Sequence, residues 1–128
     1  MLSFKTLNFI TLGVSFVLSI ILLFFPKVIF LLFGVGGNES AYFISRRASM
    51  FFIGYAFICY FSRNLKPSEN RQSISFGIAI SMLGFAILGI YEFLRGFAGA
   101  GIFLAVSAEL FLSVSYFSVW WFDGKVGE

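Results

Sequence analysis

Residues 98–121 read AGAGIFLAVSAELFLSVSYFSVWW, an apolar stretch in which Glu109 is the one charged residue. At about 1.5 Å per residue, a helix of this length extends about 36 Å, enough to cross a hydrocarbon core of about 30 Å. Backbone N–H and C=O groups find no water in that core, so they must be satisfied within the segment. The pattern therefore predicts a continuous transmembrane helix.

Three further apolar stretches are long enough for the same interpretation, and they cover residues 6–25, 41–61 and 72–93. The first has no charged residue, the second carries Arg46 and Arg47 near its start, and the third carries Glu92 near its end. Transmembrane β-strands would be shorter and would alternate in hydropathy. The sequence thus predicts an all-α polytopic membrane protein, an antiparallel bundle of four transmembrane helices that forms one domain over residues 1–128.

The segments between the predicted helices contain residues that indicate where helices begin or end. Residues 26–33 begin with Pro26, which indicates either a kinked extension of the first helix or a short helix at the membrane interface. Asn38 or Ser40 is suited to cap the second helix. Bulky residues at 24–27, FFPK, are unlike a signal-peptide cleavage site, so we expect the first helix to be retained.

The overall composition excludes several functional classes. Hydrophobic residues make up 59% and charged residues 12% of the chain, against about 45–50% and 25% in soluble domains. The sequence has no His and one Cys, Cys59, which excludes a Cys/His zinc site, a haem histidine and a His-activated nucleophile. We therefore expect a protein that is not an enzyme, with no cofactor, no metal and no nucleic-acid partner.

Orientation follows from the positive charges. On one side of the predicted bundle lie five of them, Lys5, Arg63, Lys66, Arg71 and Lys125. The other side has Lys27 and Arg95, and also Arg46 and Arg47 if these count as interfacial. Because cytoplasmic loops carry the excess of Lys and Arg, both termini are predicted in the cytoplasm, and the membrane is taken as a bacterial cytoplasmic membrane.

Glu109 is the charged residue that is predicted deepest in the membrane. It lies 11 residues after Ala98, or about 16 Å, which places it near the midplane. Its row on the helix is otherwise small, with Gly101, Ala105 and Ser113, so Glu109 is predicted to face protein rather than lipid. It is either a proton, cation or headgroup site, or a tether between helices that is protonated or paired with Arg.

The other intramembrane charges are predicted in the same half of the membrane. Both Arg46 and Arg47 are expected to anchor at the headgroups. As the alternative, Arg46 shares a helix side with small residues and is the better inward candidate for a pair with Glu109, while Arg47 snorkels to phosphates. Glu92 and Arg95, three residues apart, suit a local ion pair. Together the charges indicate a polar cavity open to the outside, or a coincidence of interfacial residues.

Small and hydroxyl residues form two stripes that we interpret as helix-packing faces. The stripes are Asn8, Thr11, Ser15 and Ser19 in the first helix, and Ser73, Gly77, Ser81 and Gly84 in the third.

Several short motifs together resemble small bacterial four-helix membrane proteins of unknown function, including groups loosely similar to the DoxX-like proteins. The motifs are Arg47 followed by Phe52-Ile53-Gly54, Arg63 and Arg71, Gly84 with Gly89, and Ala108-Glu109-Leu110. The resemblance implies the four-helix fold, and it carries over no catalytic residue.

Two functional hypotheses follow from these patterns. The first is a protein that binds or conducts a small polar, ionic or lipid-headgroup ligand through Glu109, Arg46, Arg47 and Glu92. The alternative is an accessory or assembly subunit of a larger membrane complex, in which these residues are structural tethers. Four helices in 14.3 kDa enclose little volume, so we expect a homo-oligomer or a larger complex, with membrane lipids as partners.

Overall fold

A computed structural model describes residues 2–126, and over this range the chain is helical with no strand. The elements are α1 (Phe4–Phe24), α2 (Pro26–Leu32), α3 (Glu39–Ser62), α4 (Glu69–Leu94) and α5 (Ile102–Val126). The prediction of an all-α fold is confirmed.

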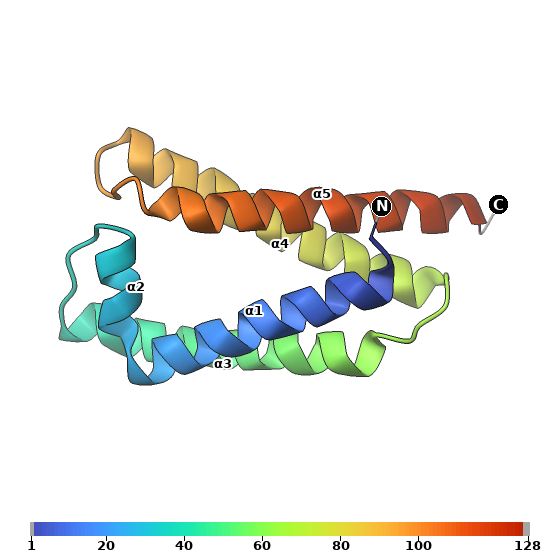
Figure 1. Cartoon of the computed structure of the whole chain (residues 1–128), viewed down its shortest axis with the longest axis horizontal. Helices are drawn as coiled ribbons and strands as arrows, with labels where there is room; N and C mark the ends of the chain where they lie inside the picture. The colour runs from blue at the N-terminus through green and yellow to red at the C-terminus, as the bar shows by residue number, and fades with distance from the viewer. Residues whose placement is uncertain (1, 127–128) are drawn as a thin grey trace.

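The four long helices form two antiparallel hairpins (Figure 1). Helix α1 packs along α3, and α4 packs along α5, whereas contact between the hairpins is sparse and runs mainly through α1 and α5. Both ends of the chain lie at the same end of the bundle as the α3–α4 connection, which we call the termini end. Helix α2 and the α4–α5 connection lie at the other end, which we call the α2 end.

Polar caps set where three of the helices begin. The side chains of Ser3, Asn38 and Ser68 accept hydrogen bonds from backbone N–H groups three residues later. Each cap satisfies a donor that would otherwise be unpaired, so the helix can begin before the apolar run does. As a result α1, α3 and α4 start two or three residues earlier than hydropathy predicted, and Asn38 is confirmed as a cap.

Helix α5 is displaced toward the C-terminus relative to the prediction of residues 98–121. It begins at Ile102 because the preceding turn uses Gly96 at φ +82° and donates the Gly99 N–H to the Phe33 carbonyl at 2.7 Å. Glu109 is therefore seven residues, or about 11 Å, from the start of the helix. Since α5 is about 36 Å long, Glu109 lies in its first third, and the predicted position near the membrane midplane stays a prediction.

The segment after α1 is a separate short helix rather than a continuation of α1. The backbone changes direction at Phe25, with φ −136° and ψ 52°, and Pro26 occupies the first turn of α2. A proline is favoured there because its missing N–H has no partner in a first turn. Helix α2 then crosses the end of the first hairpin (Figure 1).

The hydrophobic core gathers toward the termini end. Its buried members come from α1, α3, α4 and α5, and they are Phe4, Leu7, Cys59, Ile78, Ala79, Met82, Leu112, Tyr116 and Val119. At the α2 end the hairpins meet again through backbone, where a Cβ atom at Gly101 would overlap the Leu32 carbonyl oxygen. The hairpins are thus joined at both ends.

The two predicted packing stripes have different outcomes. Asn8, Thr11, Ser15 and Ser19 are all buried, which confirms the stripe on α1. On α4, Ser73 and Gly77 are exposed, which contradicts the stripe at these two positions, whereas Ser81 is partly buried and hydrogen bonds with the Tyr55 hydroxyl of α3. The buried face of α4 is instead formed by Ser75, Ile78, Ala79, Met82, Ala86 and Gly89. Four of these six residues are small, so α4 does use small residues for close packing, but on a different face from the predicted one.

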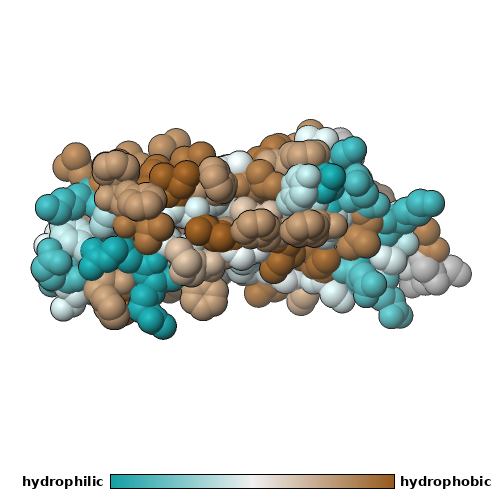
Figure 2. Space-filling model, turned by 90° about the horizontal axis from the view of Figure 1, so that it is seen from below, coloured by the Kyte–Doolittle hydropathy of each residue, from teal (hydrophilic) through white to brown (hydrophobic). Residues whose placement is uncertain are grey.

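Three helices, α1, α4 and α5, are long and apolar enough to span a membrane. The prediction of four such helices is therefore confirmed for three. Helix α3 falls short because Arg46 and Arg47 leave an uncharged run of only residues 48–62, about 22 Å. Figure 2 shows a hydrophobic zone between hydrophilic ends, as expected for a membrane protein.

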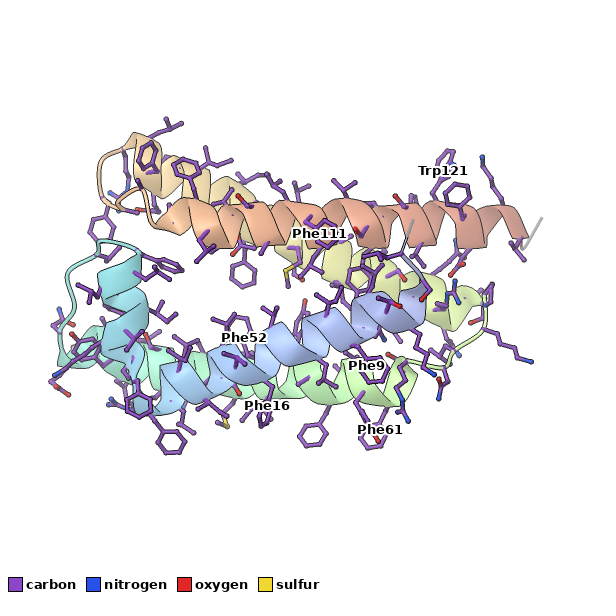
Figure 3. All side chains as sticks on the ribbon, viewed as in Figure 1. Phe9, Phe16, Phe52, Phe61, Phe111 and Trp121 are labelled. Carbon is purple, nitrogen blue, oxygen red and sulfur yellow. The ribbon has the colours of Figure 1, made fainter. Side chains whose placement is uncertain are left out.

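Large apolar side chains cover the outside of the bundle. Phe16 and Phe61 point away from the second hairpin, and both are exposed (Figure 3). Phe52 points the other way, toward the space between the hairpins. Exposed phenylalanines would be costly in water but are favourable against acyl chains.

Candidate ligand cavity

A cavity of about 590 Å³ lies between the two hairpins, and all five helices contribute to its wall. The hairpins touch at the termini end through the core and at the α2 end through backbone, and the cavity occupies the region between these contacts. Ile29 and Leu32 of α2 line it at the α2 end. Thr11 lines it toward the termini end and hydrogen bonds with Tyr116 at 2.9 Å.

Several side chains that line the cavity are also exposed at the surface of the bundle. Between α3 and α4, the rings of Phe52 and Phe85 stack with their centroids 6.2 Å apart and form part of the wall. Between α1 and α5, Val17 and Leu104 line the cavity while remaining 54% and 67% exposed.

Glu109 is the one charged residue among those that line the cavity. It is partly buried, and it forms no hydrogen bond or ion pair with any side chain or backbone group of residues 2–126. Its neighbours in the wall include Ala105, Ala108 and Leu112, which are apolar. The predicted orientation of this side of α5 toward protein is confirmed, since Ser113 is also buried and donates to the Ala79 carbonyl at 2.9 Å.

Arg46 and Arg47 lie elsewhere. Both side chains are exposed on α3, and neither lines the cavity. The predicted Arg46–Glu109 pair is not formed. The buried face of α3 consists of Ser49, Ala56, Cys59 and Ser62, and Arg46 lies at its exposed edge. A small serine lets the neighbouring helix approach, which an inward arginine would prevent.

Glu92 is also outside the cavity. It pairs with Arg95 at 2.6 Å, three residues along the chain, and both side chains are largely accessible. The predicted local ion pair is confirmed. The four candidate residues therefore do not form one cluster, and only Glu109 reaches the cavity.

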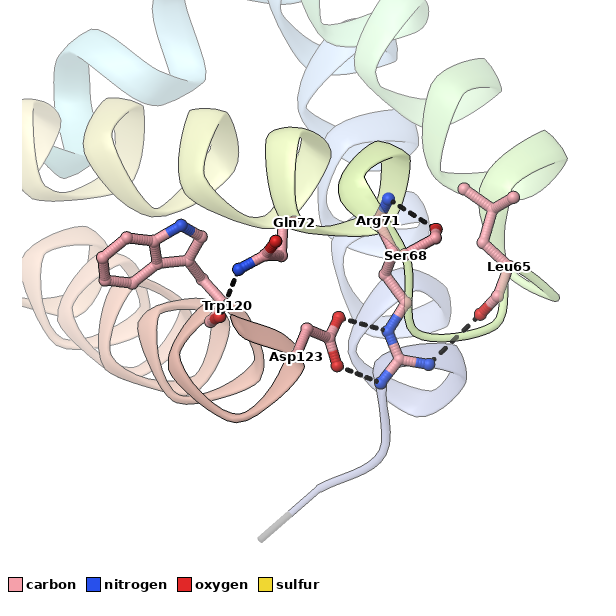
Figure 4. A network of polar contacts seen from close by, with 6 residues as sticks. All are labelled: Leu65, Ser68, Arg71, Gln72, Trp120 and Asp123. Carbon is pink, nitrogen blue, oxygen red and sulfur yellow. Dashed lines mark hydrogen bonds and ion pairs between the residues drawn. The ribbon is translucent and has the colours of Figure 1, made fainter. Parts of the chain in front are cut away.

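A buried ion pair that the sequence interpretation did not single out joins α4 to α5 (Figure 4). Arg71 donates from Nε to Asp123 Oδ2 at 2.8 Å and from Nη2 to Oδ1 at 3.1 Å, and its Nη1 donates to the Leu65 carbonyl at 3.1 Å. The two side chains are 19% and 3% exposed. The sequence did contain a signal for this pair. Arg71 precedes one predicted helix and Asp123 follows the next, and in an antiparallel hairpin these two ends lie side by side.

A polar network inside the termini end joins α1, α3 and α5. The Asn8 side-chain N–H groups donate to the Cys59 carbonyl at 3.0 Å and to Ser62 Oγ at 2.9 Å. The Tyr116 hydroxyl donates to Asn8 Oδ1 at 2.9 Å and also contacts Thr11. Buried polar groups need such partners, so this network fixes how the first hairpin meets α5.

No protein-family model, curated protein or solved structure matches the chain. The resemblance to DoxX-like proteins therefore stays a prediction. Within residues 2–126, no three His, Cys, Asp or Glu side chains gather as metal ligands would.

Proposed function

We propose that the protein is a membrane protein that binds an amphipathic molecule in the cavity between its hairpins, with Glu109 as the polar contact. The observation that carries the proposal is a single carboxyl side chain, without a hydrogen-bond or ion-pair partner among residues 2–126, in a mainly apolar wall. The volume of about 590 Å³ falls within the range of about 300–1,000 Å³ typical of ligand pockets.

The chemistry of the wall narrows the ligand class. An apolar wall favours a hydrophobic body, and an unpaired carboxylate in a medium of low dielectric favours a cation or a strong hydrogen-bond donor. A hydrophobic cation or amine meets both requirements, whereas a small hydrophilic ion meets only the second. Such a ligand partitions into the bilayer, and we expect it to reach the cavity from there.

We further infer that all four long helices span a bacterial cytoplasmic membrane and that both termini are cytoplasmic. The support is the five positive residues of the termini end, against four at or near the α2 end. In this arrangement α3 crosses the membrane with Arg46 and Arg47 extended toward the headgroups at the α2 end.

Replacing Glu109 tests the function directly. Tetraphenylphosphonium, a permanent hydrophobic cation, should bind saturably to the detergent-purified full chain in equilibrium dialysis. A hydrogen bond or ion pair to a charged group is worth about 1.5–3 kcal/mol, so Glu109→Gln should weaken binding by about 10-fold to 100-fold. Glu92→Gln is the matched control, and it should change the affinity by less than about 2-fold because its ion pair is exposed.

Equal affinity of Glu109→Gln and the unmodified chain, with both eluting as folded protein in gel filtration, would overturn the proposal. So would an absence of saturable binding to the unmodified chain.

One observation favours the second candidate, an accessory subunit of a larger complex. Arg46 and Arg47 are exposed on the outside of α3, where a partner helix with acidic residues would satisfy them better than lipid does. This candidate predicts that Arg46→Leu/Arg47→Leu releases a stoichiometric membrane partner while leaving tetraphenylphosphonium binding unchanged.

A further inference from the structure

A second pocket, of about 330 Å³, lies at the termini end and is separate from the Glu109 cavity. Four parts of the chain line it: the N-terminal residues 2–5, the α3–α4 connection at 63–65, Arg71 of α4, and the last turns of α5. None of these residues lines the larger cavity.

This pocket is positively charged. Lys5, Arg63 and Arg71 line it together with one acidic residue, Asp123, so three positive charges face one negative charge. Asp123 is already paired with Arg71. Lys5 and Arg63 form no ion pair with any residue from 2 to 126, which leaves two uncompensated positive charges in one pocket.

Internal contacts hold the two arginines in place. Arg63 donates from Nη1 to the Tyr60 carbonyl at 2.6 Å, and its guanidinium lies 4.0 Å from the centroid of the Tyr60 ring. These contacts use one edge and one face of the guanidinium, and the remaining N–H groups stay available. Arg71 is fixed by Asp123 and by the Leu65 carbonyl, as Figure 4 shows. A guanidinium held in this way loses little rotamer entropy when it binds an anion.

The rest of the lining suits the boundary between membrane and water. Asn64 and Ser3 add polar groups, while Leu2, Leu65 and Phe122 add apolar surface. Phe122 is also exposed, so part of the pocket faces the side of the bundle. A ligand here would meet cations on one side and hydrocarbon on the other.

We propose that this pocket binds the phosphodiester group of an anionic membrane lipid, with Lys5 and Arg63 as the contacts to the phosphate oxygens. Arg and Lys are the residues that bind phosphate, and basic pockets between membrane helices suit anionic headgroups. The adjoining apolar residues favour a lipid over free phosphate, because they would contact the glycerol and the first acyl carbons.

Lipid titration of the detergent-purified full chain tests this site. Micelle-dispersed phosphatidylglycerol should raise the thermal unfolding midpoint at about 10-fold lower concentration than phosphatidylcholine does. The variant Lys5→Ala/Arg63→Ala should lose this preference by about 10-fold or more. Lys66→Ala is the matched control, since it removes a positive charge from the same connection without touching the pocket, and its effect should be below about 2-fold.

A charge-conserving variant separates recognition from folding. Arg63→Lys keeps the positive charge and should retain most of the preference for phosphatidylglycerol, whereas Lys5→Ala alone, in an exposed position, should lose about 5-fold. The proposal is overturned if phosphatidylglycerol and phosphatidylcholine act equally, or if Lys66→Ala loses as much as the double variant. It is also overturned if inorganic phosphate displaces phosphatidylglycerol, because the site would then be one for free phosphate.

Discussion

Asp123→Ala is expected to lower the free energy of unfolding by about 3 kcal/mol, the largest effect of a single substitution that we predict. Removing the carboxylate leaves the Arg71 guanidinium with the Leu65 carbonyl and the face of the Phe4 ring, and with no anion, among residues 2–126. The cost of breaking a buried pair is about 3–5 kcal/mol, and the partial exposure of Arg71 places this pair at the lower end. Unfolding of the purified chain in mixed micelles of increasing dodecyl sulfate content measures it.

Two companion variants make this test specific. Glu92→Ala breaks the exposed ion pair with Arg95 and should change stability by less than about 1 kcal/mol. The double replacement Asp123→Leu/Arg71→Met removes both buried charges and should recover part of the lost stability, because no uncompensated charge remains. If Asp123→Ala is no more destabilising than Glu92→Ala, the buried pair does not join α4 to α5.

Asn8→Ala is expected to cost about 2–3 kcal/mol in the same assay. The substitution removes three hydrogen bonds at once, those to the Cys59 carbonyl, the Ser62 hydroxyl and the Tyr116 hydroxyl. Each interhelical hydrogen bond in a membrane protein is worth about 0.6 kcal/mol on average and at most about 1.7 kcal/mol. Losing three bonds at one position makes Asn8 the most sensitive residue of α1.

A double-mutant cycle checks that the Asn8 network acts as a unit. Tyr116→Phe should cost about 1 kcal/mol, and the combined variant should cost less than the sum of the two single variants because they share a bond. Ser118→Ala is the control, since that exposed hydroxyl bonds only within its own helix. Strict additivity of Asn8 and Tyr116 would show that the network does not form.

The helices themselves were largely predictable from the sequence, and their ends were less so. Hydropathy locates a helix by its apolar residues, but Ser3, Asn38 and Ser68 start helices on polar residues through capping. The start of α5 was predicted too early because the turn before it depends on a backbone bond from Gly99 to the distant Phe33. A contact between segments so far apart in the sequence has no local pattern.

The candidate site was predicted in part, for a similar reason. The small residues Ala105 and Ser113 on the same side of the helix correctly placed Glu109 toward protein. The same argument failed for Arg46. Small residues also lie near Arg46 on α3, but the side of α3 that packs against α1 is the one with Ser49, and Arg46 is exposed. The cavity itself results from the way that the two hairpins separate between their contacts at each end, which is a property of the tertiary structure.

The most direct test of ligand binding between the hairpins is the tetraphenylphosphonium affinity of a chain whose cavity is filled. Ala108→Trp places a large ring in the wall next to Glu109 and should weaken binding by about 10-fold or more, although the carboxylate is unchanged. Val114→Trp, on the exposed side of the same helix, should bind within about 2-fold of the unmodified chain. Undiminished affinity of Ala108→Trp would contradict the proposal, because the cation would then bind outside the cavity.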